Sequence, residues 1–587
     1  MIKKRSFVVL IIIMISLITL IARLMQIQLI STESFSKENI NLIEASVSQR
    51  TQEMVIDQGR GKFVDRNGDS LTHEIYPSLV LFPFLGEMDW PVEEIAKIIN
   101  VSTTTLENAV TNANKPFAYG GEQPLKLTET QVNEINGLQI PGVFAVNRQY
   151  ELDTKNAEHL IGLLRENEEL LKERYPEKEQ LSPRTPLGIT GLQAAFDEFL
   201  LPEGEAKLLY HVDGDGGPLF GIDVKYIAPA NPFYPVAIKT TLDKEIQLLA
   251  EQVIGKYNMK KGGLVLLDIE NNDIVAMVSV PEIDQSDPFG DASAQNQMLL
   301  PQFPGSVFKT VIAAATIESN LPTANRSFDC SLDLYGNRAK EYNYGPLSFT
   351  ESFARSCNYT FATLAQELIE INPDIIEKYA DKLGLLQQVG WSGDVFHFKD
   401  FRQLPEEYSG QIWGDEKDKF VLKAIAQTAI GQKEVRITPL AIANMMATIA
   451  RGGEKKEVRA VQEILYKSGT TLYSFSEQTL NDDTIAPYTA IILQQLLREV
   501  VKNEKGTGRR FQTLPYEVAG KSGTAETGKT NENGVPLVNK WFAGYFPVTE
   551  PRYALVVVDL DQVSSKSVTN DVYYDFVNQL YQLEKQK

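Results

Sequence analysis

Ser306 and Lys309 are a pair of residues whose types and spacing suit nucleophilic chemistry. They lie in FPGSVFKTVIAAATIES, where Pro304 and Gly305 interrupt the preceding structure and an apolar run follows at once. Ser306 is therefore predicted at the start of a helix, with Lys309 on the same helical face. A lysine whose pKa is lowered by burial or by nearby positive charge can take the proton of a serine hydroxyl. The N–H groups of the helix start also suit a developing oxyanion.

The S-x-x-K spacing alone has low specificity. About two such matches are expected by chance in a chain of this length and composition, and SFSK at 34–37 is another. We prefer Ser306 because the 34–37 segment opens no apolar helix. The alternative for Ser306 is a helix-capping serine beside a surface lysine.

A second polar element, Ser356-Cys357-Asn358, follows in GPLSFTESFARSCNYTFA. It lies early in another predicted helix or on the turn before it. A hydroxyl and an amide two residues apart can relay a proton and orient a substrate amide, whereas helix capping is the alternative. Cys357 is interpreted as a small buried residue, although a disulfide with Cys330 is an alternative outside the cell.

A third element, K-S-G-T, occurs twice. The copy at 467–470 lies in VRAVQEILYKSGTTLYSF, where alternating polarity on both sides predicts the polar tip of a hairpin. The copy at 521–524 lies in YEVAGKSGTAET, a predicted strand whose small residues let a ligand approach the backbone. A strand edge that carries Lys521, Ser522 and Thr524 offers an ammonium and hydroxyls to a carboxylate and pairs with an extended peptide. We therefore select the second copy.

The overall composition excludes several classes of protein. A chain of 587 residues is too long for one ordinary core, so we expect at least two domains. A formal net charge of −20 argues against nucleic-acid binding. Two cysteines and four scattered histidines argue against a disulfide-dense scaffold, a zinc ribbon or a metalloenzyme. No metal or organic cofactor is expected.

The N-terminus resembles a membrane anchor. Basic residues at 3–5 precede an uncharged apolar run over 7–22, and apolar character resumes after Arg23. We predict a cytoplasmic tail at 1–6 and a single transmembrane helix at 7–29, with the rest of the chain outside the cell membrane. A cleaved signal peptide is the alternative, but no small-x-small cleavage site follows the apolar run.

The remaining chain divides near residue 230. The segment PANPFYP (229–235) holds three prolines and marks the boundary between predicted domains at 30–230 and 231–587. The Gly- and Asp-rich segment 211–221 is interpreted as a turn, because it lacks the third acidic ligand and the closing Glu of a calcium loop.

The second domain is predicted to be α+β with one antiparallel sheet. GGLVLLDI (262–269) and DIVAMVSVP (273–281) form a predicted hairpin of buried strands. A helix-rich stretch covers about 304–450, and KWFAGYFPV (540–548) and RYALVVVDL (552–560) are further predicted strands. Strands, a helical insertion and strands again indicate this fold class.

The order S-x-x-K, S-x-N, K-[ST]-G is far more specific than any one motif, and it matches the set of penicillin-binding proteins and class A β-lactamases. The chain resembles the class B, monofunctional penicillin-binding proteins of the penicillin-binding protein 2/3 type. RGKFVDRNG (60–68) and GITGLQAAFDEFL (188–200) are similar to segments of their pedestal domain. Three stretches are similar to their catalytic domain: DIENNDIVAMVSVP (268–281), IGQKEVRITPLAIA (430–443) and NKWFAGYFP (539–547). Ser522, where Thr is commoner, is a small departure.

The resemblance implies an α+β serine transpeptidase/β-lactamase-like domain, with an antiparallel sheet flanked by helices, at 231–587. It also implies an elongated, dimerisation-type pedestal at 30–230. The implied activity is peptidoglycan D,D-transpeptidation, in which an acyl-enzyme forms on the stem peptide and D-Ala leaves. Implied partners are D-Ala-D-Ala stem peptides, β-lactams that acylate the same serine, and a separate membrane glycosyltransferase of the SEDS type.

Residue roles follow from the same resemblance. Ser306 would be the nucleophile and Lys309 its general base. Ser356 would relay a proton to the leaving group, and Asn358 would hold the substrate amide.

The third motif would bind the terminal carboxylate through Lys521, Ser522 and Thr524, while Gly523 keeps the strand clear. The backbone N–H groups of Ser306 and Thr524 would form the oxyanion hole.

Four alternatives share some of these features. A β-lactamase has the motifs but lacks the anchor and the long N-terminal region. A β-lactam sensor needs several membrane spans, and a bifunctional enzyme needs a glycosyltransferase domain in place of the pedestal. A scaffold with an inactive site would not need the intact motif set.

Overall fold

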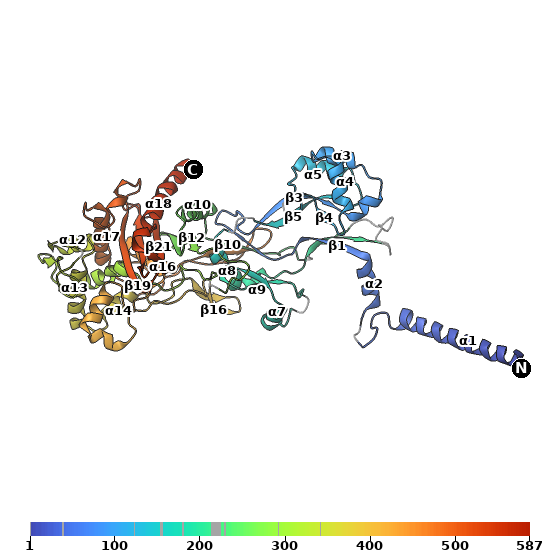
Figure 1. Cartoon of the computed structure of the whole chain (residues 1–587), viewed down its shortest axis with the longest axis horizontal. Coiled ribbons are helices and arrows are strands. Elements are labelled where there is room, and N and C mark those ends of the chain that lie inside the picture. The colour runs from blue at the N-terminus through green and yellow to red at the C-terminus, as the bar shows by residue number, and fades with distance from the viewer. Residues whose placement is uncertain are drawn as a thin grey trace. The chain divides into compact units, whose positions relative to one another are not determined.

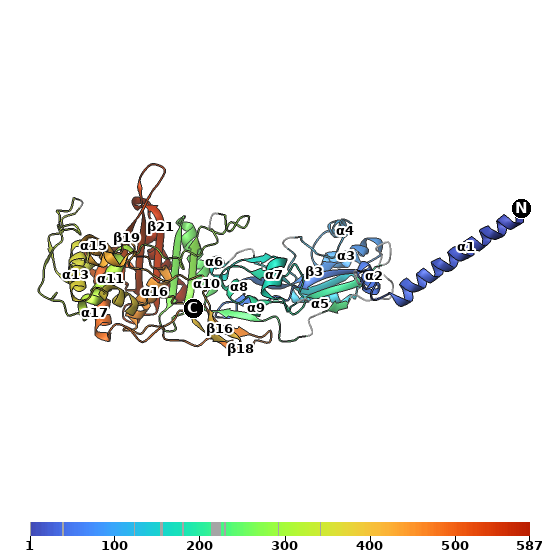
Figure 2. The same ribbon diagram turned by 90° about the horizontal axis from the view of Figure 1, so that it is seen from below.

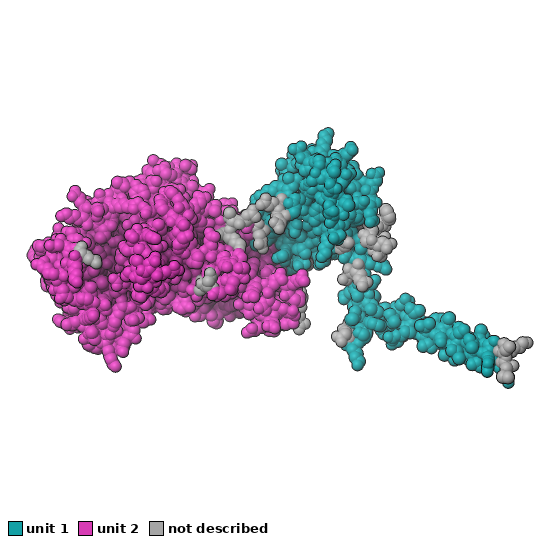
Figure 3. Space-filling view, viewed as in Figure 1, with its two compact units in different colours: residues 1–59, 73–151, 203–231 teal, residues 60–72, 152–202, 232–587 magenta. Residues whose placement is uncertain are grey.

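The computed structural model describes most of the chain, namely residues 2–37, 40–121, 124–152, 156–178, 181–212, 225–227, 231–290, 293–340 and 342–587. Most of the predicted turn at 211–221 lies outside the described residues. By its contacts the chain divides into two units (Figure 3): the first comprises residues 1–59, 73–151 and 203–231, and the second comprises 60–72, 152–202 and 232–587.

The N-terminal apolar run forms one long helix (Figure 1). Helix α1 (Ile2–Met25) continues into a π-helical turn, η1 (Gln26–Ile30). Over Lys4–Ile30 its most apolar window has a mean hydropathy of 2.8 and no share buried inside the protein. By length and composition this helix can cross a membrane, and it contains the predicted span.

The rest of the first unit is built on two small sheets. One has the order β4-β3-β5 and the other the order β1-β8-β9. The core of this unit includes Leu79 to Phe82, which lie at the end of the central strand β3 and just after it. They belong to one cluster with Ile95 of α3 and Leu106 of α4. The elements are α2 (Leu42–Arg50), β1 (Thr51–Asp57), β3 (His73–Leu81), η2 (Pro83–Glu87), α3 (Val92–Ile98), α4 (Thr103–Thr111), β4 (Phe117–Ala118), α5 (Glu129–Gly137), β5 (Val143–Glu151), β8 (Ala206–His211) and β9 (Lys225–Ile227).

The second unit contains a five-stranded antiparallel sheet with the order β12-β11-β21-β20-β19. Its strands are β11 (Gly262–Asp268), β12 (Ile274–Val280), β19 (Ala519–Thr530), β20 (Pro536–Phe546) and β21 (Tyr553–Val563). The predicted hairpin and the two predicted C-terminal strands are therefore confirmed. The sheet joins the two ends of the domain sequence, because β11 pairs with β21.

Both faces of this sheet are buried. Val265 and Leu267 of β11 belong to a core with the central helices, while Leu264 and Leu266 belong to a second core with the flanking helices α10 and α18. Strands covered on both faces carry continuous apolar runs instead of alternation. Figure 2 shows α11 and α13 together on one side of the sheet and α10 on the other.

The helices that surround the sheet begin and end as follows: α10 (Lys244–Lys256), η3 (Gly305–Phe308), α11 (Lys309–Glu318), α12 (Phe349–Ala354), α13 (Asn358–Ile371), α14 (Ile375–Lys382), η4 (Glu416–Phe420), α15 (Leu422–Ala429), α16 (Pro439–Ala450), α17 (Pro487–Lys502), η5 (Arg509–Thr513), η6 (Ser564–Lys566) and α18 (Thr569–Gln586). Smaller elements of this unit are β2 (Lys62–Val64), α6 (Glu158–Ile161), β6 (Leu164–Glu166), α7 (Glu168–Arg174), β7 (Pro186–Gly188), α8 (Gly191–Ala195), α9 (Asp197–Leu200), β10 (Ala237–Thr240), β13 (Phe328–Asp329), β14 (Pro346–Leu347), β15 (Ser392–Val395), β16 (Phe398–Arg402), β17 (Val461–Leu465) and β18 (Thr471–Ser474).

A buried ion pair joins the segments 60–68 and 188–200, both within the second unit. The Arg60 guanidinium donates to Asp197 at 2.8 Å, and both side chains are almost fully buried. Asp197 also accepts from the Gly188 N–H at 2.7 Å and the Tyr175 hydroxyl at 3.0 Å. Removing Asp197 would leave the Arg60 guanidinium buried without its carboxylate, at an expected cost of about 3–5 kcal/mol.

Candidate active site

Ser306 lies on the single 3-10 turn η3, and Lys309 begins α11 directly after it. The prediction of a helix start at Ser306 is confirmed. Gly305 has a φ of +54°, and a Cβ there would lie 2.3 Å from the carbonyl oxygen of Thr524. A Cβ at Gly523 would lie 2.6 Å from the Pro304 carbonyl oxygen. The two glycines therefore allow the Ser306 turn to lie directly against strand β19.

Lys309 is completely buried, and its Nζ contacts residues of the second motif, Ser356 and Asn358. Its Nζ donates to the Ser356 carbonyl oxygen at 2.8 Å, to the Ser356 Oγ at 3.1 Å and to the Asn358 Oδ1 at 2.6 Å. Burial lowers the pKa of Lys309 well below its usual value, and the positive charge of Lys521 lowers that pKa further.

Lys521 reaches the same hydroxyl from strand β19. Its Nζ donates to the Ser356 Oγ at 3.0 Å and to the Ser522 carbonyl oxygen at 3.1 Å. Its side chain is also fully buried, and burial lowers the pKa of Lys521 to about 7. Two lysines from distant parts of the chain thus converge on the Ser356 hydroxyl.

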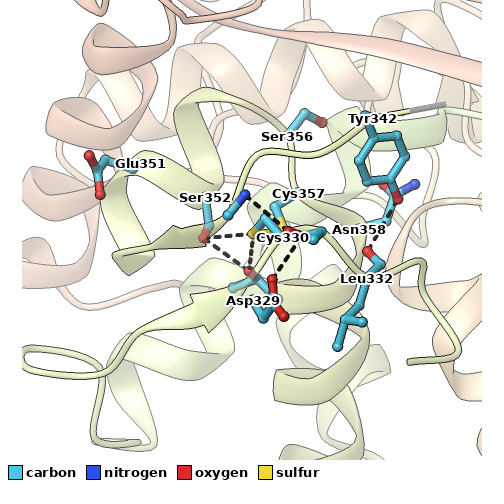
Figure 4. Close-up of a disulfide and its surroundings, with 12 residues drawn as sticks. Asp329, Cys330, Leu332, Tyr342, Glu351, Ser352, Ser356, Cys357 and Asn358 are labelled. Carbon is cyan, nitrogen blue, oxygen red and sulfur yellow. Dashed lines mark hydrogen bonds between the residues drawn. A yellow bond between two sulfur atoms is a disulfide. The ribbon is translucent and has the colours of Figure 1, made fainter. Parts of the chain in front are cut away.

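The second motif occupies the turn between α12 and α13. Ser356 has a left-handed backbone with a φ of +59°, and Asn358 is the first residue of α13. Cys357 between them is bonded to Cys330 (Figure 4). The prediction that Cys357 is a small buried residue is confirmed, and the structure contains the disulfide with Cys330 that the sequence left as the alternative. Cys357 is 1% exposed, and it is cross-linked to a segment before β14 that packs beneath the turn.

The disulfide is embedded in hydroxyl groups. The Cys330 Sγ lies 3.6 Å from the Ser352 Oγ and 3.5 Å from the Thr360 Oγ1, and Thr360 donates to Ser352 at 2.9 Å. This cluster ties the end of α12 to the first turn of α13. The Ser356 turn is consequently held on both sides by buried contacts.

A cavity of about 550 Å³ is lined by residues of all three motifs. Of the predicted site residues, five line it: Ser306, Ser356, Asn358, Ser522 and Thr524. The other three, Lys309, Lys521 and Gly523, are buried behind them. All eight residues therefore belong to one region of the second unit.

Sequence patterns missed several cavity residues. Thr507 accepts a hydrogen bond from the Ser522 Oγ at 2.7 Å. Tyr342 and Tyr344 stack with ring centroids 5.1 Å apart, and the Arg355 guanidinium lies 4.1 Å from the Tyr344 ring centroid. These side chains belong to loops without a motif. The Tyr-Asn-Tyr run and the position of Arg355 beside Ser356 were the available signals.

The two discarded motif copies lie elsewhere. The K-S-G-T copy at 467–470 forms the turn between β17 and β18, where Ser468 donates to Thr470, so the predicted hairpin tip is confirmed. The SFSK copy at 34–37 opens no helix. Neither copy lines the cavity.

One group of carboxylates in the second unit has a spacing that suits a metal ion. Asp374, Glu377 and Glu416 place oxygens within 4.8 Å of one another. The Lys419 Nζ lies 2.8, 2.6 and 2.6 Å from these three carboxylates. A single ammonium thus pairs with all three carboxylates, and the cluster is an ion-pair network centred on Lys419.

The fold and the motif geometry define a serine acyl-transfer domain of the penicillin-recognising kind, and a family model agrees. The model for the penicillin binding protein transpeptidase domain matches residues 262–578, so the chain belongs to the penicillin-binding protein transpeptidase family. The family that the three motifs indicate is therefore confirmed.

Several characterised proteins are similar to this chain. Stage V sporulation protein D of Bacillus subtilis is 24% identical over 85% of this chain and 73% of its own length. The peptidoglycan D,D-transpeptidase MrdA of Haemophilus influenzae is 21% identical over 92% of this chain and 85% of its own length. Penicillin-binding protein PbpB of Mycolicibacterium smegmatis is 26% identical over 64% of this chain.

Coverage of the mycobacterial relatives is partial. The match spans 58% of PbpB and 66% of the peptidoglycan D,D-transpeptidase PbpA of Mycobacterium tuberculosis, which is 27% identical. A solved structure described as "Structural coordination of polymerization and crosslinking by a peptidoglycan synthase complex" is also similar. It has a TM-score of 0.62 at 21% identity and covers 97% of both chains, which supports the fold.

Proposed function

We propose that this protein is a peptidoglycan D,D-transpeptidase that crosslinks stem peptides through an acyl-enzyme on Ser306. The observation that carries the proposal is the convergence of Lys309 and Lys521 on the Ser356 hydroxyl, at the wall of the cavity that Ser306 lines. Two buried lysines with lowered pKa values beside an accessible serine are costly for stability. Such an arrangement is typical of a site built for proton transfer.

The first half of the reaction forms an ester. The Ser306 Oγ bonds to the carbonyl carbon of the penultimate D-Ala while neutral Lys309 takes the hydroxyl proton. The backbone N–H groups of Ser306 and Thr524 stabilise the oxyanion. The peptide C–N bond then breaks, and the nitrogen of the terminal D-Ala leaves after it receives a proton through Ser356.

The third motif and Asn358 orient the donor peptide. Lys521, Ser522 and Thr524 bind its terminal carboxylate, and Gly523 leaves room for the backbone. Asn358 holds the substrate amide. In the second half, a primary amine of another strand attacks the ester carbon, the C–O bond breaks, and Ser306 regains its proton. A β-lactam acylates the same serine and remains as an ester.

The other parts of the chain suit a membrane-bound cell-wall enzyme. We infer that α1 is a single-pass anchor with a cytoplasmic N-terminus, because basic residues precede its apolar run. We assign residues 30–230 to a pedestal of the dimerisation type and 231–587 to the catalytic domain. Polymerisation of the glycan strand then falls to a separate membrane glycosyltransferase of the SEDS type. In support, the similar solved structure belongs to a peptidoglycan synthase complex that coordinates polymerisation and crosslinking.

The test is the intact mass of the full-length chain in detergent after exposure to benzylpenicillin. A stable adduct of one penicillin per chain is expected, and Ser306→Ala should abolish it. Ser34→Ala and Ser36→Ala, in the discarded S-x-x-K copy, are the matched controls and should acylate normally.

Two other outcomes distinguish alternative functions. Rapid return of unmodified protein with hydrolysed drug would identify a β-lactamase. Absence of any adduct, together with absence of D-Ala release from a D-Ala-D-Ala peptide by the folded chain, would reject acyl transfer and leave a scaffold.

A further inference from the structure

Glu526 is the one acidic side chain among the described residues that line the active-site cavity. It lies on β19 and is exposed to solvent. Within the described part of the chain, no basic side chain lies within salt-bridge distance of its carboxylate. Its charge is therefore available to a ligand in the cavity.

The two basic residues of the cavity lining are already engaged. The Arg355 guanidinium stacks on the Tyr344 ring, and Lys433 forms an ion pair with Asp418. The lining thus combines two partnered cations with one unpartnered anion.

Glu526 continues the row of β19 side chains that faces the cavity. Along the strand, Lys521, Gly523 and Ala525 are buried, whereas Ser522, Thr524 and Glu526 alternate with them and are half-buried or exposed. Strand residues two apart lie on one face, about 6.5–7 Å from each other. The carboxylate is consequently one such step beyond Thr524, whose N–H we assign to the oxyanion hole.

β19 is also the terminal strand of its sheet. Its outer edge is the place where an extended peptide can pair with the backbone. A peptide on this edge has its acyl centre near Ser306 and its neighbouring residues near Glu526.

The chemistry of crosslinking brings a cation to this place. Transfer consumes a primary amine of a stem peptide, and an alkyl amine with a pKa of about 10.4 is an ammonium at neutral pH. Donor and acceptor strands are copies of one peptide, so each carries that amine. An ammonium that enters this cavity is stabilised by a negative charge, and among the described lining residues only Glu526 supplies a carboxylate.

We propose that Glu526 is a substrate-binding residue that recognises the side-chain ammonium of a stem peptide. This inference rests on the proposed transpeptidase function and adds to it the charge that the substrate must carry. The two sources of the ammonium, donor strand and acceptor strand, share the same chemistry and are separated by two assays.

The donor assay measures D-Ala release by the full-length chain in detergent from Nα-acetyl-L-Lys-D-Ala-D-Ala and from its Nε-acetyl derivative. The acceptor assay uses a thioester of N-benzoyl-D-alanine, which carries no amine, and measures its transfer to the ε-amine of Nα-acetyl-L-Lys-D-Ala relative to its hydrolysis. Each assay compares the wild type with Glu526→Gln. Glu532→Gln, on the turn between β19 and β20 and outside the cavity lining, is the matched control.

An exposed ion pair predicts one of two effects of about two- to fivefold. Either D-Ala release is faster from the free than from the Nε-acetyl peptide (donor assay), or the ratio of transfer to hydrolysis is higher in the wild type than in Glu526→Gln (acceptor assay); either effect is the preference for the ammonium. Glu526→Gln should abolish this preference and Glu532→Gln should retain it. The preference should also fall as salt is raised from about 0.05 M to 0.5 M, because exposed charges are screened. A loss in the donor assay assigns the ammonium to the donor strand, and a loss in the acceptor assay assigns it to the acceptor strand.

Equal preferences in the wild type and Glu526→Gln in both assays would overturn the inference. If Glu526→Gln lowers the rate of D-Ala release equally from the free and the acetylated peptide, the inference is also overturned, since that pattern indicates a structural role. Benzylpenicillin acylation of each variant confirms its fold. If the wild type neither forms this adduct nor releases D-Ala, the proposed function itself fails and the inference falls with it.

Discussion

At the scale of single residues, the site is dominated by two lysines whose pKa values are lowered by burial. Lys309 and Lys521 both donate to the Ser356 Oγ, and neither side chain contacts solvent. Desolvation disfavours the ammonium form of both lysines, and the positive charge of Lys521 further lowers the pKa of Lys309. A lysine can act as a base near neutral pH only under such conditions.

Lys309→Met is expected to lower the rate of benzylpenicillin acylation by about 10²–10⁴-fold, because it removes the base that we propose for Ser306. Folding should persist, since methionine fills the buried site without a charge. The acylation rate is measured by intact mass over time. Lys467→Met, in the discarded K-S-G-T copy, should match the wild type, and a rate for Lys309→Met equal to the wild type would exclude its role as base.

The acylation rate of the wild type should fall as the pH is lowered, because Lys309 becomes protonated and can no longer accept the Ser306 proton. In Lys521→Met one nearby positive charge is removed, so the pKa of Lys309 rises and the acid limb of the profile moves to higher pH. Acylation rates between about pH 5 and 9 measure the limb. A limb that stays in place or moves to lower pH would show that Lys521 does not act on Lys309.

At the scale of elements, three separate pieces of backbone hold these side chains in place: the turn η3, the turn between α12 and α13, and strand β19. The disulfide anchors the second piece, and two glycines let the first and third touch. The positions of the proposed catalytic side chains therefore depend on contacts made by other residues.

Replacing both cysteines with serine should lower the free energy of unfolding by about 2–4 kcal/mol. It should also slow acylation, because the Ser356 turn loses its covalent anchor. Thermal unfolding and adduct formation are measured with and without a reductant. The reductant should affect the wild type and leave the double variant unchanged. Equal acylation rates in the oxidised and reduced wild type would mean that hydrogen bonds alone hold the turn.

Gly305→Ala should reduce acylation by about 100-fold, since the new Cβ would press on the Thr524 carbonyl oxygen and shift Ser306 relative to β19. Gly469→Ala is the matched control. Gly469 also has a positive φ, +85°, but a Cβ there meets nothing within 4 Å. The control should show only the stability loss of the strained backbone. Equal acylation rates in the two variants would reject the packing argument.

At the scale of the whole molecule, an apolar helix long enough to cross a membrane and a transpeptidase-family domain occur in one chain. The most apolar window of α1 has no share buried in the protein. The catalytic domain has two cores of its own, one on each face of its sheet. Nothing in these contacts requires α1 for folding of the domain.

Deletion of residues 1–30 should therefore release the protein from the membrane fraction while its benzylpenicillin acylation rate stays within about twofold of the full chain. Fractionation and intact mass measure the two properties. A truncated chain that stays with the membrane would reveal a second attachment. A truncated chain that no longer forms the adduct would show that the helix supports the site.

The sequence by itself was sufficient for features that depend on near neighbours in the chain. An uncharged run over 7–22 predicts α1, the apolar runs near 262 and 273 predict a hairpin of buried strands, and the run near 552 predicts a further strand. Pro304 and Gly305 before an apolar run predict the helix start at Ser306. The order of three short motifs was sufficient to recognise the family, because each motif is local.

Only the tertiary structure could decide which distant groups meet. The order of strands in the sheet places β19 beside η3, and the packing of α11 against α13 brings Lys309 to Ser356. The pairing of Cys330 with Cys357 and the available charge of Glu526 depend on the same packing. Burial and distance shift pKa values and select partners, and both are properties of the folded chain that no local pattern contains.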